Sequence, residues 1–278
     1  MKRFYLQFIT SLFFLSLCIS DETIEYYESG EISGRGNLIN GKKHGKWIEY
    51  FQNGQKRVAS NYKNGKEDGD WIYYFESGEI RIECAYKNGK LDGKKIWYYE
   101  NGNKGWEENY VNGKIEGKWT YYFENGQISS ERHYNNGIKN GKETWYYKNG
   151  VKHSEGFFKD GKKNGKWIFY NMDGSKGQEG HFKDDKEHGE FIYYGYGNKE
   201  IFGKMKSEYY KNGTLDGEYV HYFESGRINS VGTFVNGKQE GKYIFYDENG
   251  NVYWEGFYED GELIEGNFIK TDKPFKLF

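Results

Sequence analysis

Glycine recurs along this chain at a constant spacing of 24 residues, and no other feature of the sequence constrains the fold as strongly. The glycine that precedes each aromatic run stands at Gly45, Gly69, Gly93, Gly117, Gly141, Gly165, Gly189, Gly217 and Gly241. Two more glycine columns, which begin at Gly30 and Gly41, have the same period. One step, from Gly189 to Gly217, is four residues longer. A fixed period of this length indicates an array of structural repeats.

Each repeat has the composition of two β-strands joined by tight turns. Asn-Gly and Ser-Gly pairs stand at the turns, where a positive φ angle is required. β-branched and aromatic residues fill the segments between the turns, as is typical of strands. These patterns predict an all-β fold, an elongated, twisted antiparallel meander of about ten 24-residue repeats with two strands each.

Aromatic residues occupy both alternating sets of positions in the first strand of a repeat. Neighbouring residues of a strand point to opposite faces, so Trp119 and Tyr121 share one side and Tyr122 lies on the other. A sheet with one solvated face would show polar residues in one of the two sets. Two explanations remain open: the sheet curls so that one face closes on itself, or an aromatic surface stays exposed and binds a partner.

If an aromatic surface binds a partner, five aromatic residues are the candidates for contact with it. Four of them occupy the same strand position in successive repeats, and the fifth lies in the longer repeat, within the segment GYGNKEIFGKMK. The candidate partner-binding residues are Trp97, Tyr121, Trp145, Phe169 and Tyr196.

The N-terminal 20 residues differ from the rest of the chain. Two cationic residues precede an apolar run that ends at Leu17, and small residues follow. This is the outline of a secretory signal, and the apolar run is short for a membrane span. We therefore expect cleavage between Ser20 and Asp21. A lipidated Cys18 is one alternative, although that motif favours a small residue in the position that Leu17 occupies. A signal that is retained as a membrane anchor is the other.

The chain is thus expected to comprise a signal peptide (1–20), a repeat array (21–266) and a C-terminal tail (267–278). The array would be extracellular or located in the cell envelope. The formal net charge is −2, and the sequence shows no obvious basic stripe. Because nucleic-acid binding relies on clustered basic residues that displace counterions, we expect no nucleic-acid partner.

No group of residues in the sequence predicts catalysis, a cofactor or a metal site. Three segments that begin at Gly36, Gly156 and Gly232 read G-x-x-x-x-G-K, but none continues with Ser or Thr or opens a helix, as a phosphate-binding loop does. The histidines lack a paired metal-ligand spacing. A glutamate column with the 24-residue period, which includes Glu107, runs beside a lysine column and predicts a solvated charge ladder. Cys84 is expected to be a small packing residue.

The segment YKNGKEDGDWIYYFESGEI, from Tyr62 to Ile80, and its counterparts resemble the MORN repeat, in the bacterial variant form also found in proteins described as YwqK-type antitoxins. The shared pattern is Tyr-x-Asn-Gly-Lys-x-x-Gly-x-Trp-x-x-Tyr followed by a second glycine turn, and it covers the chain from about Tyr26 to Gly266. The resemblance implies an extended antiparallel sheet with two strands per repeat. It also implies scaffolding and self-association, and it leaves no segment for the kinase domain that accompanies MORN repeats in certain lipid kinases.

The expected function is therefore that of an exported, non-enzymatic repeat scaffold that mediates protein–protein interaction, for example in adhesion at the bacterial surface. Its partner would be a protein of unknown identity, and no cofactor is expected. Two alternatives remain open. One is a cell-wall or glycan-binding module, although choline-binding repeats with a similar aromatic run have a shorter period. The other is an antitoxin or immunity protein that neutralises a partner toxin, against which the signal segment argues if that role is cytosolic.

Overall fold

The computed structural model describes residues 21–195 and 203–269, and the regular structure in these two ranges is entirely β-strand. The N-terminal strands are β1 (Asp21–Tyr26), β2 (Ile32–Ile39), β3 (Lys42–Tyr50), β4 (Lys56–Lys63), β5 (Lys66–Glu67), β6 (Gly69–Tyr74), β7 (Ile80–Lys87), β8 (Lys90–Leu91) and β9 (Gly93–Tyr98). The central strands are β10 (Lys104–Val111), β11 (Lys114–Ile115), β12 (Gly117–Tyr122), β13 (Ile128–Asn135), β14 (Ile138–Lys139), β15 (Gly141–Tyr146), β16 (Lys152–Lys159), β17 (Lys162–Lys163) and β18 (Gly165–Tyr170). The C-terminal strands are β19 (Lys176–Lys183), β20 (Lys186–Tyr194), β21 (Lys204–Lys211), β22 (Thr214–Tyr222), β23 (Ile228–Val235), β24 (Lys238–Tyr246), β25 (Val252–Glu259) and β26 (Glu262–Phe268).

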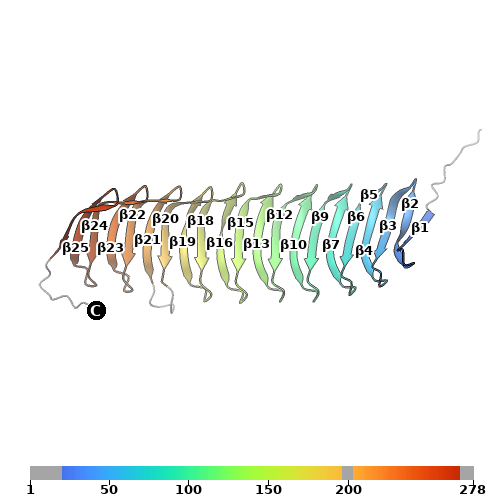
Figure 1. Ribbon diagram of the computed structural model, residues 1–278, viewed down its shortest axis with the longest axis horizontal. Helices are drawn as coiled ribbons and strands as arrows, with labels where there is room; N and C mark the ends of the chain where they lie inside the picture. Colours follow the sequence, from blue (N-terminus) through green and yellow to red (C-terminus); the bar gives the residue numbers. More distant parts are fainter. Residues whose placement is uncertain (1–20, 196–202, 270–278) are drawn as a thin grey trace, which may run out of the picture.

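The strands form one open antiparallel sheet in which neighbours along the chain are neighbours in space. They lie side by side across the long axis of the molecule, in chain order from β1 to β25 (Figure 1). The predicted all-β meander of two-strand repeats is confirmed. The predicted signal peptide (1–20) and the candidate Tyr196 lie outside the described residues.

Two kinds of turn alternate along the sheet and follow from its glycines. At the first kind, two residues with positive φ join the strands, as in Asn64 (φ 53°) and Gly65 (φ 81°). These are the mirror-image hairpin turns that suit the natural strand twist. One repeat uses Asp184 and Asp185 there, both with positive φ. The second kind spans five residues, as in the turn from Phe51 to Gln55.

Glycine also bends the first strand of each repeat. Gly69 has a φ of 106°, and the bulge that it creates separates the two-residue strand β5 from β6. The same break separates β8 from β9, β11 from β12, β14 from β15 and β17 from β18. The additional short strands are therefore parts of the predicted two-strand repeats and add no further repeats.

Backbone hydrogen bonds tie each two-residue turn from Asn64-Gly65 onward to the preceding repeat. The amide of Gly65 donates to the carbonyl of Lys43 at 2.8 Å, and the amide of Gly89 donates to that of Glu67 at the same distance. In addition, the carboxylate of Asp68 accepts a bond from the amide of Asn88 at 3.2 Å. These bonds connect consecutive two-residue turns into one row along a long side of the sheet, and the five-residue turns lie in a second row along the opposite side (Figure 1).

The sheet is a single layer, so its packing occurs between rings and neighbouring strands. Four large aromatic side chains are at most 3% exposed, namely Trp47, Trp167, Phe191 and Tyr243. Each lies over a glycine of the preceding long strand, where a Cβ would approach the ring within 2.2–2.4 Å. The glycines concerned are Gly36, Gly156, Gly180 and Gly232. Three of these four open the G-x-x-x-x-G-K segments, and they make room for a ring on a strand.

Within residues 21–195 and 203–269 there is no helix that is long and apolar enough to cross a membrane.

Candidate partner-binding face

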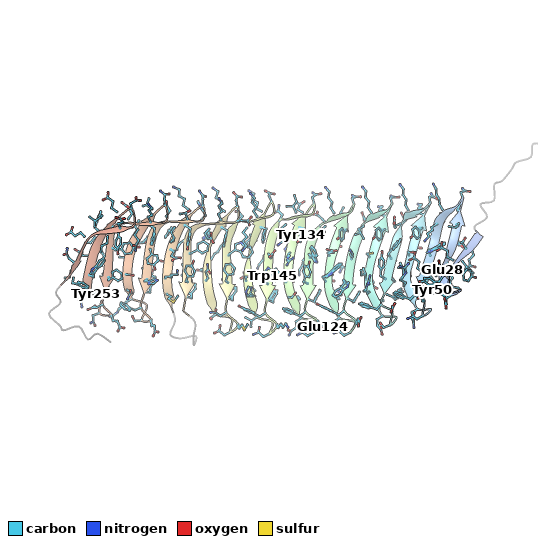
Figure 2. All side chains as sticks on the ribbon, viewed as in Figure 1. Glu28, Tyr50, Glu124, Tyr134, Trp145 and Tyr253 are labelled. Atoms are coloured by element: carbon cyan, nitrogen blue, oxygen red, sulfur yellow. The ribbon has the colours of Figure 1, made fainter. Side chains whose placement is uncertain are left out.

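Four of the five predicted binding residues lie on one face of the sheet, which we call the aromatic face. Trp97 and Tyr121 both pair with Trp106, and Tyr121 and Trp145 both pair with Ser130. The row continues to Phe169 through Ser154. Each of the four rings is half-buried. Figure 2 shows Trp145 in the middle of the strands, between the two rows of turns.

Contacts between rings account for the partial burial. The ring of Trp97 meets that of Tyr99 edge to face at 4.7 Å, and Trp119 stacks on Tyr121 at 4.9 Å. These offset and edge-to-face arrangements are the favourable ones for aromatic pairs. The sheet is open, so the face does not close on itself. One side of each ring in the row therefore serves packing, and the remaining surface faces solvent.

A guanidinium group lies at the centre of the aromatic face. Arg132 stands between the rings of Tyr121 and Trp145, with its central carbon 4.8 Å and 4.6 Å from the two ring centres. Its side chain is only 17% exposed. A planar guanidinium stacks well on aromatic faces because it is delocalised and weakly hydrated. Sequence reasoning missed Arg132, because its position is occupied by Gly156 or Gly180 in later repeats.

Glu143 balances this cation. Its carboxylate accepts a hydrogen bond from the indole of Trp145 at 2.6 Å and one from Lys139 at 2.7 Å, and it lies 3.8 Å from Nε of Arg132. Glu143 is 5% exposed, in a column that holds Trp119 and Trp167 in the adjacent repeats. A charged pair replaces the usual ring-on-glycine packing at this point.

A second buried carboxyl lies one repeat earlier. Glu108 is 4% exposed and accepts a hydrogen bond from the hydroxyl of Tyr110 at 2.8 Å. Its other oxygen has no hydrogen-bond partner among the described residues. Burial raises the pKa of Glu108, and the nearby Lys95 partly offsets that effect. Lys95 pairs with Glu108 across the strands and breaks the same aromatic column as Glu143 does.

The centre of the aromatic face therefore differs chemically from its two ends. We call Lys95, Glu108, Arg132 and Glu143, with the rings of Tyr121 and Trp145, the central cluster. A signal for it exists in the sequence, because Lys95 and Glu143 are the two non-aromatic residues in the column that runs from Trp47 to Tyr243.

The opposite face, which we call the ionic face, carries the predicted charge ladder. Glu155 accepts hydrogen bonds from Tyr170 at 2.7 Å and Lys152 at 3.0 Å, and it pairs with Lys142 at 2.8 Å. Burial alone would raise the pKa of this carboxyl, but the bonds from Lys142, Tyr170 and Lys152 outweigh it and lower the pKa to about 2. Glu107 and Glu179 have the same three kinds of partner.

Neither face presents a group suited to a metal ion. In the part of the chain that the structure describes, no three His, Cys, Asp or Glu side chains gather closely enough to hold one. Cys84 is 6% exposed, and burial raises the pKa of its thiol to about 11. It occupies the small-residue position that Ser60 and Gly156 fill elsewhere, in agreement with a packing role.

Comparison with known proteins is consistent with this architecture. The MORN repeat variant family model matches six segments, residues 43–64, 67–88, 115–136, 139–160, 215–236 and 239–260. No curated protein matches the chain.

Among solved structures, the TcdB2-TccC3-TEV crystal structure is 12% identical, with 85% of this chain and 14% of that chain covered and a TM-score of 0.20. The Tc holotoxin pore of Photorhabdus luminescens is 12% identical, with 85% of this chain and 15% of that chain covered and a TM-score of 0.20. A porin-like protein from Bacteroides uniformis is 10% identical, with 79% of this chain and 92% of that chain covered and a TM-score of 0.18.

This chain spans about a seventh of the toxin-complex chains, and at these TM-scores the likenesses carry no argument about function. The family matches agree with the strands and turns described above, since each matched segment contains one five-residue turn and the strands that flank it. The chain is a MORN repeat protein.

Proposed function

We propose that this MORN repeat protein is a non-enzymatic scaffold that binds a protein partner across its aromatic face. The observation that carries the proposal is the position of Arg132 between Tyr121 and Trp145, at the centre of a row of half-buried rings. Arginine, tyrosine and tryptophan are the residue types that dominate binding energy in protein interfaces. A cluster of all three, surrounded by polar side chains, has the composition of such a centre.

The shape of the face favours a protein over a small ligand. Small-molecule sites are concave and enclose most of their ligand. The aromatic face is instead an open row that extends over several repeats, from Trp97 to Phe169. A partner with a similarly extended surface could contact several rings at once, and the Lys95 and Glu143 positions would fix its register.

We further propose that the protein acts outside the cytoplasm, because residues 1–20 have the outline of a secretory signal. Adhesion and neutralisation of a toxin are both forms of the same protein-binding role. The narrower resemblance to YwqK-type antitoxins stays a prediction, and the identity of the captured partner would decide between these forms.

The test compares two double variants of the chain from residue 21 onward. One removes rings from the aromatic face, Trp97→Ser with Trp145→Ser. The matched control removes two rings from the ionic face, Phe157→Ser with Phe257→Ser, which are 53% and 50% exposed. Circular dichroism first establishes that both variants are folded.

The partner captured by the unmodified chain is then titrated against each variant. Loss of one interface centre costs at least about 2 kcal/mol, so we expect the first variant to bind roughly 30-fold or more weakly. The control should bind within about threefold of the unmodified chain, since scattered surface changes contribute little. Equal affinity for all three proteins would contradict the proposal, and competition by soluble glycans would indicate the glycan-binding alternative.

A further inference from the structure

The last strand of the sheet has one edge that no described strand covers. β26 lies at the red, C-terminal end of the row of strands (Figure 1), and among the described residues it pairs with β25 alone. All seven of its residues are exposed. The backbone groups that point away from β25 are therefore available to a further strand.

Most of β26 is regular enough to act as a template for such a strand. Beyond the bulge opposite Phe257 and Tyr258, residues 265–268 pair one to one with residues 254–257. The amide of Ile269 continues the ladder and donates to the carbonyl of Tyr253 at 2.9 Å. Lysine and proline commonly protect the edge strands of natural sheets against further pairing, and β26 contains neither.

Apolar side chains accompany this open backbone. Leu263, Ile264 and Phe268 are 51%, 60% and 80% exposed. Glu265 pairs with Phe257 and so lies on the ionic face, and alternation along the strand therefore places Phe268 on the aromatic face. The edge thus presents an exposed ring on one face and a carboxylate on the other.

The charge of this edge is negative. β26 carries Glu262 and Glu265 and no basic residue. On the ionic face, Glu265 lines a shallow hollow together with Glu255, Phe257 and Asn267. Two carboxylates therefore border the place that the side chain of an added strand would enter.

Glu255 has fewer partners than its counterparts inside the sheet. In the described part of the chain its ion pair is with Lys242, at 2.7 Å, and its side chain is 39% exposed. The equivalent Glu155 is 17% exposed and also binds Lys152 and, from the following strand, Tyr170. A strand added beyond β26 could supply the cationic partner that Glu255 and Glu265 lack.

We infer that the open edge of β26 binds an extended segment of a partner protein by strand addition, and that this segment alternates apolar residues with lysine or arginine. Main-chain hydrogen bonds would hold the segment, and its alternate side chains would point to opposite faces of the sheet. The apolar side chains then pack beside Phe268, and the cationic side chains meet Glu265 and Glu255.

A second copy of the chain fits this edge poorly. Pairing of β26 with β26 would bring glutamates together. The other end strand, β1, carries Asp21, Glu22 and Glu25 and no basic residue, so its pairing with β26 would also oppose like charges. Like charges on neighbouring strands are destabilising. The charges therefore favour a basic segment of a different protein.

Fluorescence anisotropy tests the inference with a labelled seven-residue peptide in which valine alternates with lysine. We expect it to bind the chain from residue 21 onward saturably at about 50 mM salt and more weakly at about 500 mM, where exposed ion pairs are screened. Two control peptides should not bind. One has N-methylated amides, which keep the charge but prevent strand pairing, and the other has glutamate in place of lysine.

Charge reversal locates the binding edge. Glu262→Lys with Glu265→Lys should weaken binding of the lysine peptide about tenfold and should allow the glutamate peptide to bind, because attractive pairs become repulsive and the reverse. The matched control, Glu22→Lys with Glu25→Lys, makes the same change on β1 and should stay within about threefold of the unmodified chain. All four residues are exposed, and circular dichroism establishes that both variants are folded.

The Trp97→Ser with Trp145→Ser protein should bind the lysine peptide as the unmodified chain does, which separates this inference from the proposed function of the aromatic face. No binding of the lysine peptide, equal binding of its N-methylated form, or an equal effect of the β1 variant would overturn the inference. Binding that begins only when residues 270–278 are removed would also overturn it, because that segment would then occupy the edge. A dimer of the chain that excludes the peptide would show that a second copy occupies it instead.

Discussion

Gly156→Ala should destabilise the protein, although alanine is ordinarily the better strand residue. A Cβ at this position would lie 2.2 Å from Cδ2 of Trp167, and ordinary contact begins at 3.4 Å, so the ring would have to move by about 1.2 Å. Trp167 is 2% exposed and is held by Phe158 and Phe182 at 5.5 and 6.3 Å between ring centres. The ring therefore has little room to move.

The expected magnitude follows from two opposing effects. Overpacking a well-packed site costs about 1–3 kcal/mol. Removing the backbone freedom of glycine returns about 0.5–1 kcal/mol. We therefore expect a net loss of about 1–2 kcal/mol in the free energy of unfolding, measured by urea titration with circular dichroism. The matched control is Gly177→Ala, where the three atoms nearest to the Cβ belong to the side chain of Asn171, the closest of them at 3.0 Å. Because this side chain can shift more easily than a buried ring, the change should be close to neutral.

A second background separates the ring contact from other causes. In a Trp167→Ala protein, the added methyl group has no ring to displace, so Gly156→Ala should be neutral or slightly stabilising there. If Gly156→Ala costs the same with and without the Trp167 ring, or no more than Gly177→Ala, the explanation of these glycines is wrong.

The remaining predictions concern charge, a thiol and the repeat register. The pKa values of Glu155 and Glu179 are about 2, below the unfolded value near 4.5, so the stability that they contribute is complete above about pH 4.5 and is lost as the pH falls toward 2. The urea concentration at the unfolding midpoint should therefore fall over this pH range, and it should fall less steeply in the double variant Glu155→Gln with Glu179→Gln. Identical slopes for the two proteins would contradict the charge ladder. Cys84 should react with an alkylating reagent at pH 8 far more slowly in the folded protein than in urea, because its pKa is about 11 and it is 6% exposed; equal rates would show that it is accessible. Deleting the full period 93–116 should leave a folded, shorter sheet, whereas deleting 93–104 should unfold it, because the second deletion joins strands on the wrong sides of their turns; equal thermal melts would refute this register.

The fold could be predicted because its determinants are local and repeated. Asn64-Gly65 specifies its turn through the conformational preferences of these two residues alone, and glycines at the corresponding positions specify the same kind of turn in the other repeats. The two-strand repeat and the antiparallel meander follow from this pattern alone, whereas the sequence left open whether the sheet curls on itself, and the structure shows that it is open. The glycines under the rings could not be assigned in this way, because the role of Gly156 depends on Trp167, which lies across the strands.

The candidate site was predictable only in part, for a similar reason. Alternation along a strand places Trp97, Tyr121, Trp145 and Phe169 on one face, and the structure confirms that placement. The stacking of Arg132 between two of these rings depends on cross-strand register and was missed.

Site-specific photocrosslinking in the producing cells tests the central claim, partner binding across the aromatic face, most directly. A photoreactive phenylalanine derivative replaces Tyr121 on the aromatic face or, as the control, Phe157 on the ionic face, where the side chain is 53% exposed. If the partner binds across the aromatic face, we expect one discrete protein adduct from position 121 and none from position 157. No adduct from position 121, or the same adduct from both positions, would contradict it.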